Sequence, residues 1–155
     1  MPLIYLAGPL FSLAEQEFNQ RLHDELVRLR PNLEVILPQQ RAKSLLKKEN
    51  GLELIFQDCL QMVVRSEAVI AILDGPDSDS GTCVELGYAH AHHKPIVGVR
   101  TDFRGSEDRG LNLMVSHLCT SLVTAKNVSI NVLAAEIIER VERLLPQTQN
   151  GSNDV

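Results

Sequence analysis

The sequence has no tryptophan, and aromatic residues make up only 4% of its 155 residues. Platforms on which nucleic-acid bases could stack are therefore scarce. Basic residues are not in excess either, because 15 Lys and Arg face 20 Asp and Glu and give a formal net charge of −5. Without a positive field to hold a phosphate backbone, the chain is not expected to bind nucleic acid.

Long apolar runs are also missing. The longest, at residues 68–73, has the length of a strand and falls far short of the roughly 20 residues that a membrane helix needs. The N-terminus has no basic segment, so we expect neither a signal peptide nor association with a membrane. The three cysteines are odd in number and form no Cys-x-x-Cys pair. This usage predicts a reducing, cytoplasmic setting, without a disulfide framework or a structural zinc site.

What is present is an alternation of strand-like and helix-like segments. Short apolar segments predict five strands, at residues 3–7, 34–37, 68–73, 96–99 and 120–123. Periodicity and capping signals predict helices between them, at residues 13–29, 52–64, 82–92, 112–118 and 130–144, with a loop or short exposed helix at 41–50. The alternation predicts an α/β fold, a flavodoxin-like or Rossmann-like three-layer sandwich around a five-stranded parallel sheet. We expect a single domain over residues 1–146 and a flexible polar tail over residues 147–155.

Ligands of such sheets bind beyond the carboxyl ends of the strands. This rule selects four loops, at residues 7–12, 38–41, 74–82 and 100–112. Glu85 follows the third loop, where it is expected in the first turn of a helix, near the positive end of the helix dipole. An ionised carboxylate there could attack an electrophilic sugar carbon. However, Thr82 and Glu85 also have the spacing of a capping box, and spacing alone favours this structural role.

Several other residues have both a functional and a structural interpretation. Tyr5 could orient a carboxylate or pack in the core, and Gly8 allows a ligand to approach the backbone closely. Cys83 could be a nucleophile, but a small buried side chain is the simpler interpretation. Three histidines at a helix end are expected to be structural, namely His90, His92 and His93. The aspartates of loop 74–82 are ordinary turn formers without EF-hand spacing, so no metal is expected.

No cofactor is expected, since the sequence contains neither Gly-x-Gly-x-x-Gly nor a Walker A motif. The motifs that are present resemble those of the nucleoside 2-deoxyribosyltransferase family. Five segments carry the resemblance in family order: Ile4-Tyr5-Leu6-Ala7-Gly8-Pro9, Ile36-Leu37-Pro38-Gln39, Ile55-Phe56-Gln57-Asp58, Asp79-Ser80-Gly81-Thr82-Cys83-Val84-Glu85-Leu86-Gly87-Tyr88-Ala89 and Leu111-Asn112-Leu113-Met114. The fourth segment is the most specific, and the combination reverses the preference for Glu85 as a cap only.

The resemblance implies a double displacement. Glu85 would attack the anomeric carbon of a 2'-deoxynucleoside, release the base and form an ester that a second base resolves with retention. Tyr5 would orient Glu85, while Asp58 and Asp79 would hold the base and pass a proton to it. The family pattern places Gln39 (or its neighbour Gln40) at the base and Asn112 of a neighbouring subunit at the 5'-hydroxyl of the sugar, with Met114 packed near the site. Gly8 and Gly81 are also expected to bind the substrate. The implied partners are 2'-deoxynucleosides, free nucleobases and further copies of the chain in a homodimer or homohexamer.

Two alternatives stay open. A sister branch hydrolyses 2'-deoxynucleoside 5'-monophosphates and has small hydroxyl side chains where this chain has Asp79 and Asn112. A carboxylate at position 79 would repel a phosphate and favours nucleosides. Other side chains could nevertheless contact a phosphate, namely Ser78, Ser80, Ser116, Arg41 and Arg104. The second alternative is a nucleotide-binding module without turnover. Some transferases also place a C-terminal aromatic residue in the active site, and residues 147–155 contain none.

Overall fold

The computed structural model describes residues 1–104 and 110–146, in which five strands alternate with six helices. The strands are β1 (Leu3–Ala7), β2 (Glu34–Ile36), β3 (Ala68–Ile72), β4 (Ile96–Arg100) and β5 (Ser121–Thr124). The helices are α1 (Leu13–Leu29), α2 (Pro38–Leu45), α3 (Gly51–Arg65), α4 (Ser80–Ala91), α5 (Leu113–Leu118) and α6 (Ile130–Leu144). All strand pairs are parallel, in the order β2-β1-β3-β4-β5. This is the flavodoxin-like order, so the predicted fold class is confirmed.

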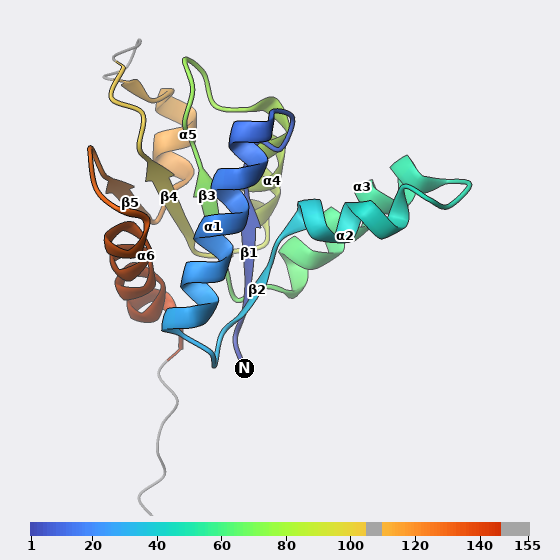
Figure 1. Cartoon of the computed structure of the whole chain (residues 1–155), viewed down its shortest axis with the longest axis horizontal. Coiled ribbons are helices and arrows are strands. Elements are labelled where there is room, and N and C mark those ends of the chain that lie inside the picture. The colour runs from blue at the N-terminus through green and yellow to red at the C-terminus, as the bar shows by residue number, and fades with distance from the viewer. Residues whose placement is uncertain (105–109, 147–155) are drawn as a thin grey trace, which may run out of the picture.

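The sheet lies between two layers of helices (Figure 1). Helices α1 and α6 cover one face, while α3, α4 and α5 pack on the other. Because successive side chains of a strand point to opposite faces, Ile4 and Leu6 of β1 enter the first core and Tyr5 and Ala7 enter the second. The alternation therefore places Tyr5 on the face covered by α3 and α4.

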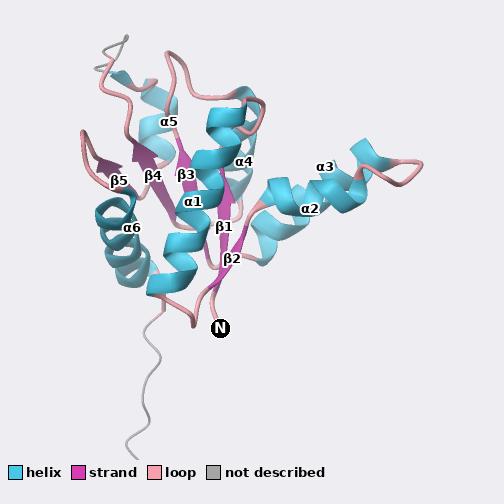
Figure 2. Cartoon of the chain, in the orientation of Figure 1, coloured by secondary structure: helices cyan, strands magenta, loops and turns pink. Residues whose placement is uncertain are grey.

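Helices α2 and α3 form a pair that projects beyond the β2 edge of the sheet (Figure 2). Helix α2 begins at Pro38, directly after β2. A proline at the first helical position loses nothing by lacking an N–H and has a φ angle suited to a helix. The prediction of a ligand-binding loop at residues 38–41 is therefore wrong, because these residues form the first turn of α2.

The start of α4 also differs from the prediction. Asp79 caps this helix, since its Oδ2 accepts hydrogen bonds from the backbone N–H of Thr82 (2.8 Å) and from the Thr82 hydroxyl (3.0 Å). The capping box expected between Thr82 and Glu85 does not form. Glu85 lies in the second turn of α4 rather than the first, which removes the expected help from the helix dipole. The capping box of Ser12 and Glu15 at the start of α1 is confirmed.

Within residues 1–104 and 110–146, no helix combines the length and the apolar character that crossing a bilayer requires. The predicted tail at residues 147–155 lies outside the described part of the chain, as does part of the predicted loop 100–112.

Candidate active site

A hydrogen bond between β1 and α4 defines the candidate site. The Tyr5 hydroxyl donates to Oε1 of Glu85 at 2.6 Å, across 80 positions of sequence. Tyr5 is completely buried, so its ring is held by the core and its hydroxyl has a fixed direction. Glu85 is half-buried. The arrangement orients one oxygen of Glu85 through a rigid donor.

Burial controls the protonation of Glu85. The pKa of Glu85 is raised to about 7, chiefly because burial disfavours the charged form; the hydrogen bond from Tyr5 lowers it and the negative charge of Asp79 raises it to a smaller extent. The pKa of Tyr5 is also raised, chiefly by burial and then by the charge of Glu85, so the phenol stays a donor. Near neutral pH, Glu85 can therefore exchange between its acid and carboxylate forms, as expected of a catalytic carboxyl group.

Asp79 lies close enough to Glu85 for its charge to act on it. Only its Oδ2 is used to cap α4. A Cβ added at Gly81 would lie 3.2 Å from that oxygen, so the glycine leaves room for the cap. Asp79 and Gly81 thus have structural tasks at the start of α4, and Oδ1 of Asp79 has no hydrogen-bond donor among the described residues.

Asp58, on α3, is held in a bidentate ion pair that the sequence did not reveal. Nε of Arg41 donates to Oδ2 of Asp58 at 2.7 Å, and Nη2 donates to Oδ1 at 2.5 Å. Cys59 follows Asp58 and lies beside Tyr5, and the charges of Asp58, Arg41 and Glu85 all act on its thiol. Burial is the main cause that raises the pKa of Cys59 and keeps it neutral. The pair joining α2 to α3 therefore lies near the Tyr5–Glu85 hydrogen bond.

Asn112 and Met114 lie at the start of α5. Oδ1 of Asn112 caps the helix by accepting from the backbone N–H groups of Met114 (2.9 Å) and Val115 (3.4 Å). The Met114 side chain is 71% exposed. Both residues line a cavity of about 310 Å³ that also includes Ser78. The Ser78 hydroxyl is buried and has no hydrogen-bond partner among the described residues.

Gln39 and Gly8 face the opposite side of the sheet. Nε2 of Gln39 donates to the carbonyl of Gln16 at 2.9 Å, and its Oε1 accepts from Asn19 at 3.4 Å. A Cβ at Gly8 would meet Ile72 at 3.1 Å. Gln39 thus contacts α1, and Gly8 is explained by close packing against β3. A contact of either residue with a base stays a prediction, which for Gln39 requires a change of partners.

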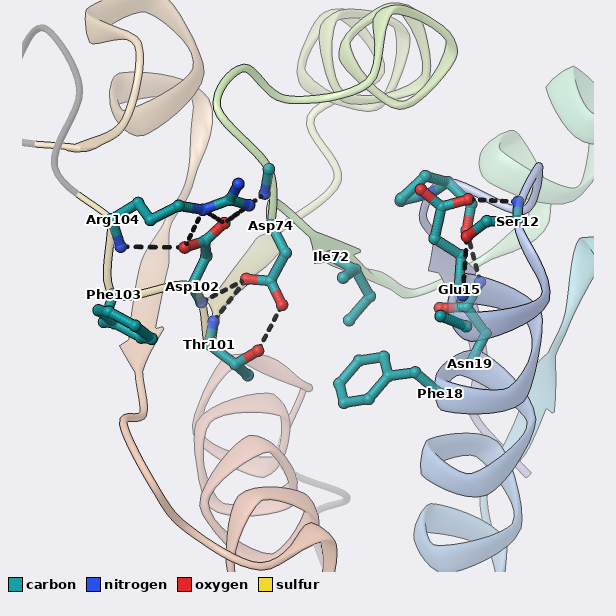
Figure 3. A pocket seen from close by; sticks show the side chains of 13 residues that line it. Ser12, Glu15, Phe18, Asn19, Ile72, Asp74, Thr101, Asp102, Phe103 and Arg104 are labelled. Carbon is teal, nitrogen blue, oxygen red and sulfur yellow. Dashed lines mark hydrogen bonds and ion pairs between the residues drawn. The ribbon is translucent and has the colours of Figure 1, made fainter.

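A larger cavity lies on the α1 side of the sheet (Figure 3). It measures about 570 Å³, and Phe18 and Phe103 contribute to its walls. Its carboxylates already have donors: Asp74 accepts from the backbone N–H groups of Thr101 (2.6 Å) and Asp102 (2.9 Å), as the dashed lines in Figure 3 show. These bonds join the loop after β3 to the end of β4. The polar wall of this cavity is therefore explained by the fold.

The other residues singled out in the sequence have structural environments. The Cys83 thiol lies 3.8 Å from the carbonyl of Ser78, and burial raises its pKa, which disfavours a thiolate nucleophile. His92 packs edge-on against Tyr88, with ring centroids 4.5 Å apart. His93 takes a left-handed conformation (φ 57°) after the end of α4. In the part of the chain that the structure describes, no group of three or more His, Cys, Asp or Glu side chains could hold a metal ion.

The protein is thus an α/β protein with a flavodoxin-like sheet. Its candidate site contains a glutamate that a buried tyrosine of the sheet orients. A family model described as nucleoside 2-deoxyribosyltransferase matches residues 4–114. The chain belongs to this family, as the resemblance predicted.

Comparison with solved structures agrees with this fold. A conserved protein from Enterococcus faecalis V583 is 29% identical with a TM-score of 0.71, over 90% of this chain and 99% of that one. A 2-deoxyribosyltransferase from Bacillus psychrosaccharolyticus is 21% identical with a TM-score of 0.66, over 85% and 90%. A CMP N-glycosidase from Clostridium botulinum is 15% identical with a TM-score of 0.57, over 88% and 98%. No curated protein matches the chain in sequence.

Proposed function

We propose that the protein transfers 2-deoxyribose between nucleobases through a covalent ester on Glu85. The observation that carries this proposal is the 2.6 Å hydrogen bond from the buried Tyr5 hydroxyl to Oε1 of Glu85. Tyr5 is the only hydrogen-bond partner of Glu85 among the described residues, so Oε2 is left to act as a nucleophile. The family membership and the likeness to transferase structures support the same reaction.

The reaction would proceed in two displacements. Oε2 of Glu85 forms a bond to the anomeric carbon while the bond to the base breaks and its electron pair leaves with the base. The negative charge of Glu85 favours the positive charge that develops on the sugar. A nitrogen of a second base then attacks the same carbon and releases Glu85, and two inversions give net retention.

The departing base needs a proton, and the two aspartates are not equivalent for this task. Both oxygens of Asp58 accept hydrogen bonds from Arg41. Asp79 uses only Oδ2 for the helix cap. We assign the proton transfer to Oδ1 of Asp79, which would take up a proton from water, pass it to the departing base and receive one from the incoming base. We assign base recognition to Asp58.

The experiment that tests the reaction uses isotopically labelled adenine with either deoxyadenosine or deoxyinosine. Transfer predicts labelled deoxyadenosine from both donors, and its loss in Glu85→Ala. Absence of product from both donors would reject transfer. A 2'-deoxynucleoside 5'-monophosphate N-glycosidase would instead release deoxyribose 5-phosphate from a deoxynucleotide without an acceptor base. The feature that favours this alternative is the hydroxyl of Ser78, next to Asp79, which is buried and has no hydrogen-bond partner among the described residues. A nucleotide-binding module would bind these compounds and convert none.

The Tyr5 hydroxyl should set the acid limb of the pH profile. The hydrogen bond from Tyr5 lowers the pKa of Glu85, so Tyr5→Phe should raise that pKa above 7. Because the ionised form attacks, kcat/KM of the parent should rise with pH through about 7, and the variant should need a higher pH. At pH 7 we expect a loss of about 5- to 10-fold that shrinks above pH 8.

Steady-state rates between pH 5 and 9 check this prediction. A loss that is equal at every pH would show that Tyr5 affects orientation alone. A profile unchanged in both height and midpoint would contradict the assigned role of Tyr5.

We further propose that the site is shared between copies of the chain. Large apolar side chains are exposed on the helices around it, namely Phe56 (51%), Val84 (63%), Leu113 (56%) and Met114 (71%). Contact between two copies would bury these side chains and bring Asn112 of one copy to the site of the other. The 2-deoxyribose hydroxyls would then meet the amide of Asn112, whose Oδ1 is already used as a helix cap.

Mixing two impaired variants tests this arrangement. Asn112→Asp keeps the cap but removes the amide donor, and Glu85→Gln removes the nucleophile. In a mixed dimer, one of the two shared sites has both native residues, so random exchange should restore about a quarter of the parent activity. Light scattering should show dimers or larger assemblies. No restoration after verified subunit exchange would contradict a shared site.

A further inference from the structure

We infer that Arg41 fixes Asp58 as a hydrogen-bond acceptor and thereby gives the site a preference for nucleobases that present an exocyclic amino group. This inference rests on the proposed function, because it concerns which bases the same site accepts. It adds Arg41 as a specificity-determining residue.

The geometry of the pair is that of an ionised carboxylate. Nε and Nη2 of Arg41 each donate to a different oxygen of Asp58, at 2.7 and 2.5 Å. This two-point contact matches the fork of the guanidinium to the plane of the carboxylate. The Asp58 side chain is only 16% exposed, compared with 40% for Arg41. Because both donors belong to one planar guanidinium, the pair fixes the plane of the Asp58 carboxylate and the directions in which its oxygens can accept further hydrogen bonds.

The pair also lies near the Tyr5–Glu85 hydrogen bond of the candidate site. Asp58 precedes Cys59, whose thiol lies beside Tyr5, and Tyr5 holds Glu85. The charges of Arg41, Asp58 and Glu85 all act on that one thiol, which is consistent with the short chain of contacts from Asp58 to Glu85. Each Asp58 oxygen keeps a further lone pair after binding Arg41 and can accept one more hydrogen bond.

The exocyclic group of each base determines how well the base fits opposite Asp58. Adenine and cytosine present an amino group that donates to a carboxylate, whereas hypoxanthine and uracil present a carbonyl oxygen at the same position. A carbonyl facing an acceptor-only carboxylate leaves two acceptors opposed and unpaired. A site that offers only a hydrogen-bond acceptor at this position discriminates strongly against a base that presents another acceptor there. We expect kcat/KM for deoxyadenosine to exceed that for deoxyinosine by about 10- to 100-fold.

Removing the guanidinium should relax this preference. In Arg41→Met, the Asp58 carboxylate loses the two hydrogen bonds that fix its plane, so it can turn away from the carbonyl oxygen of hypoxanthine. The ratio of kcat/KM for deoxyadenosine to that for deoxyinosine should fall to within about threefold. Arg41→Lys should give an intermediate ratio, since an ammonium cannot bind both oxygens in the same way. The matched control is Arg28→Met, which removes an exposed arginine paired with Glu25 on α1 and should leave the ratio unchanged.

Binding of free adenine and free hypoxanthine, measured by calorimetry on the parent and Arg41→Met, gives the same comparison without turnover. A parent that binds adenine more tightly and a variant that does not would support the inference even if Arg41→Met were inactive. Equal use and equal binding of the two bases by the parent, or a ratio that Arg41→Met leaves unchanged, would overturn it while transfer itself remained established. Failure of transfer with every donor, together with selective adenine binding that Arg41→Met abolishes, would reject the proposed reaction and keep the role of Arg41.

Discussion

Replacing Glu85 with glutamine is expected to lower transferase activity by at least about ten-thousand-fold, because no other oxygen can take its place in forming the ester. The glutamine keeps the shape of the side chain and can still accept the hydrogen bond that Tyr5 donates to Glu85. The loss would therefore report on chemistry rather than on folding. Initial rates of labelled deoxyadenosine formation measure it, with Glu53→Gln on the exposed side of α3 as a control that should behave like the parent.

The same substitution should make the protein more stable at alkaline pH. The pKa of Glu85 in the folded protein is about 7, raised from its ordinary value of 4.5. A raised pKa means that the folded state favours the protonated form, so the contribution of Glu85 to stability is complete below pH 4.5 and is lost as the pH rises through 7. Since Glu85 is partly exposed to solvent, we expect Glu85→Gln to gain about 2 kcal/mol at pH 8 and the gain to vanish near pH 4.5.

Urea unfolding at pH 5, 6, 7 and 8 measures this gain. A variant that is less stable than the parent at pH 8 would contradict the burial of an ionised Glu85. Retention of activity in Glu85→Gln, or failure of a slow fluorinated deoxynucleoside to modify the Glu85 side chain while turnover continues, would contradict its role as nucleophile.

Replacing Arg100 with methionine should lower the free energy of unfolding by about 2–4 kcal/mol, more than any other substitution proposed above. Arg100 ends β4 and is 6% exposed. Its guanidinium donates to the backbone carbonyls of Leu73 (2.5 Å), Gly75 (3.1 Å) and Arg104 (3.4 Å). Methionine fills a similar volume but removes the donors from these carbonyls, of which that of Leu73 is buried. The loop that leads from β3 to Asp79 would then keep only its hydrogen bonds through Asp74 as attachment to the end of β4.

Far-UV circular dichroism during urea and thermal unfolding checks this prediction. A loss of this size in a domain of this length corresponds to a fall in Tm of about 5–15 °C. Arg28→Met is again the control, because a solvent-exposed ion pair contributes little to stability and its loss should leave Tm nearly unchanged. A loss below about 1 kcal/mol in Arg100→Met would show that water replaces the guanidinium at these carbonyls.

Most of the fold could be predicted because its signals are local. The apolar segments that predicted the strands all occur in the sheet, with boundaries within one residue. The boundaries of α4 were less predictable, since Thr82 and Asp79 are both good caps and local spacing does not choose between them. Asp79 is the observed cap, and the resulting shift moved Glu85 into the second turn of the helix.

The site was predictable only in part. Family motifs pointed to Tyr5 and Glu85, and the structure brings these two residues into contact. No local pattern linked Arg41 with Asp58, which are 17 positions apart on different helices. The sequence also carried no sign that Gln39 would contact α1, because its side-chain partners depend on how α1 and α2 are placed around β2.

Periodicity and turn-forming residues along the chain, by themselves, determined the alternation of strands and helices, the parallel sheet and the edge at which ligands should bind. These properties depend on backbone preferences and on the burial of apolar side chains, which neighbouring residues encode. The tertiary structure alone decided the protonation of Glu85 and the pairing of Asp58 with Arg41. Both depend on desolvation and on charges brought together across the fold, and these quantities exist only after distant segments have packed.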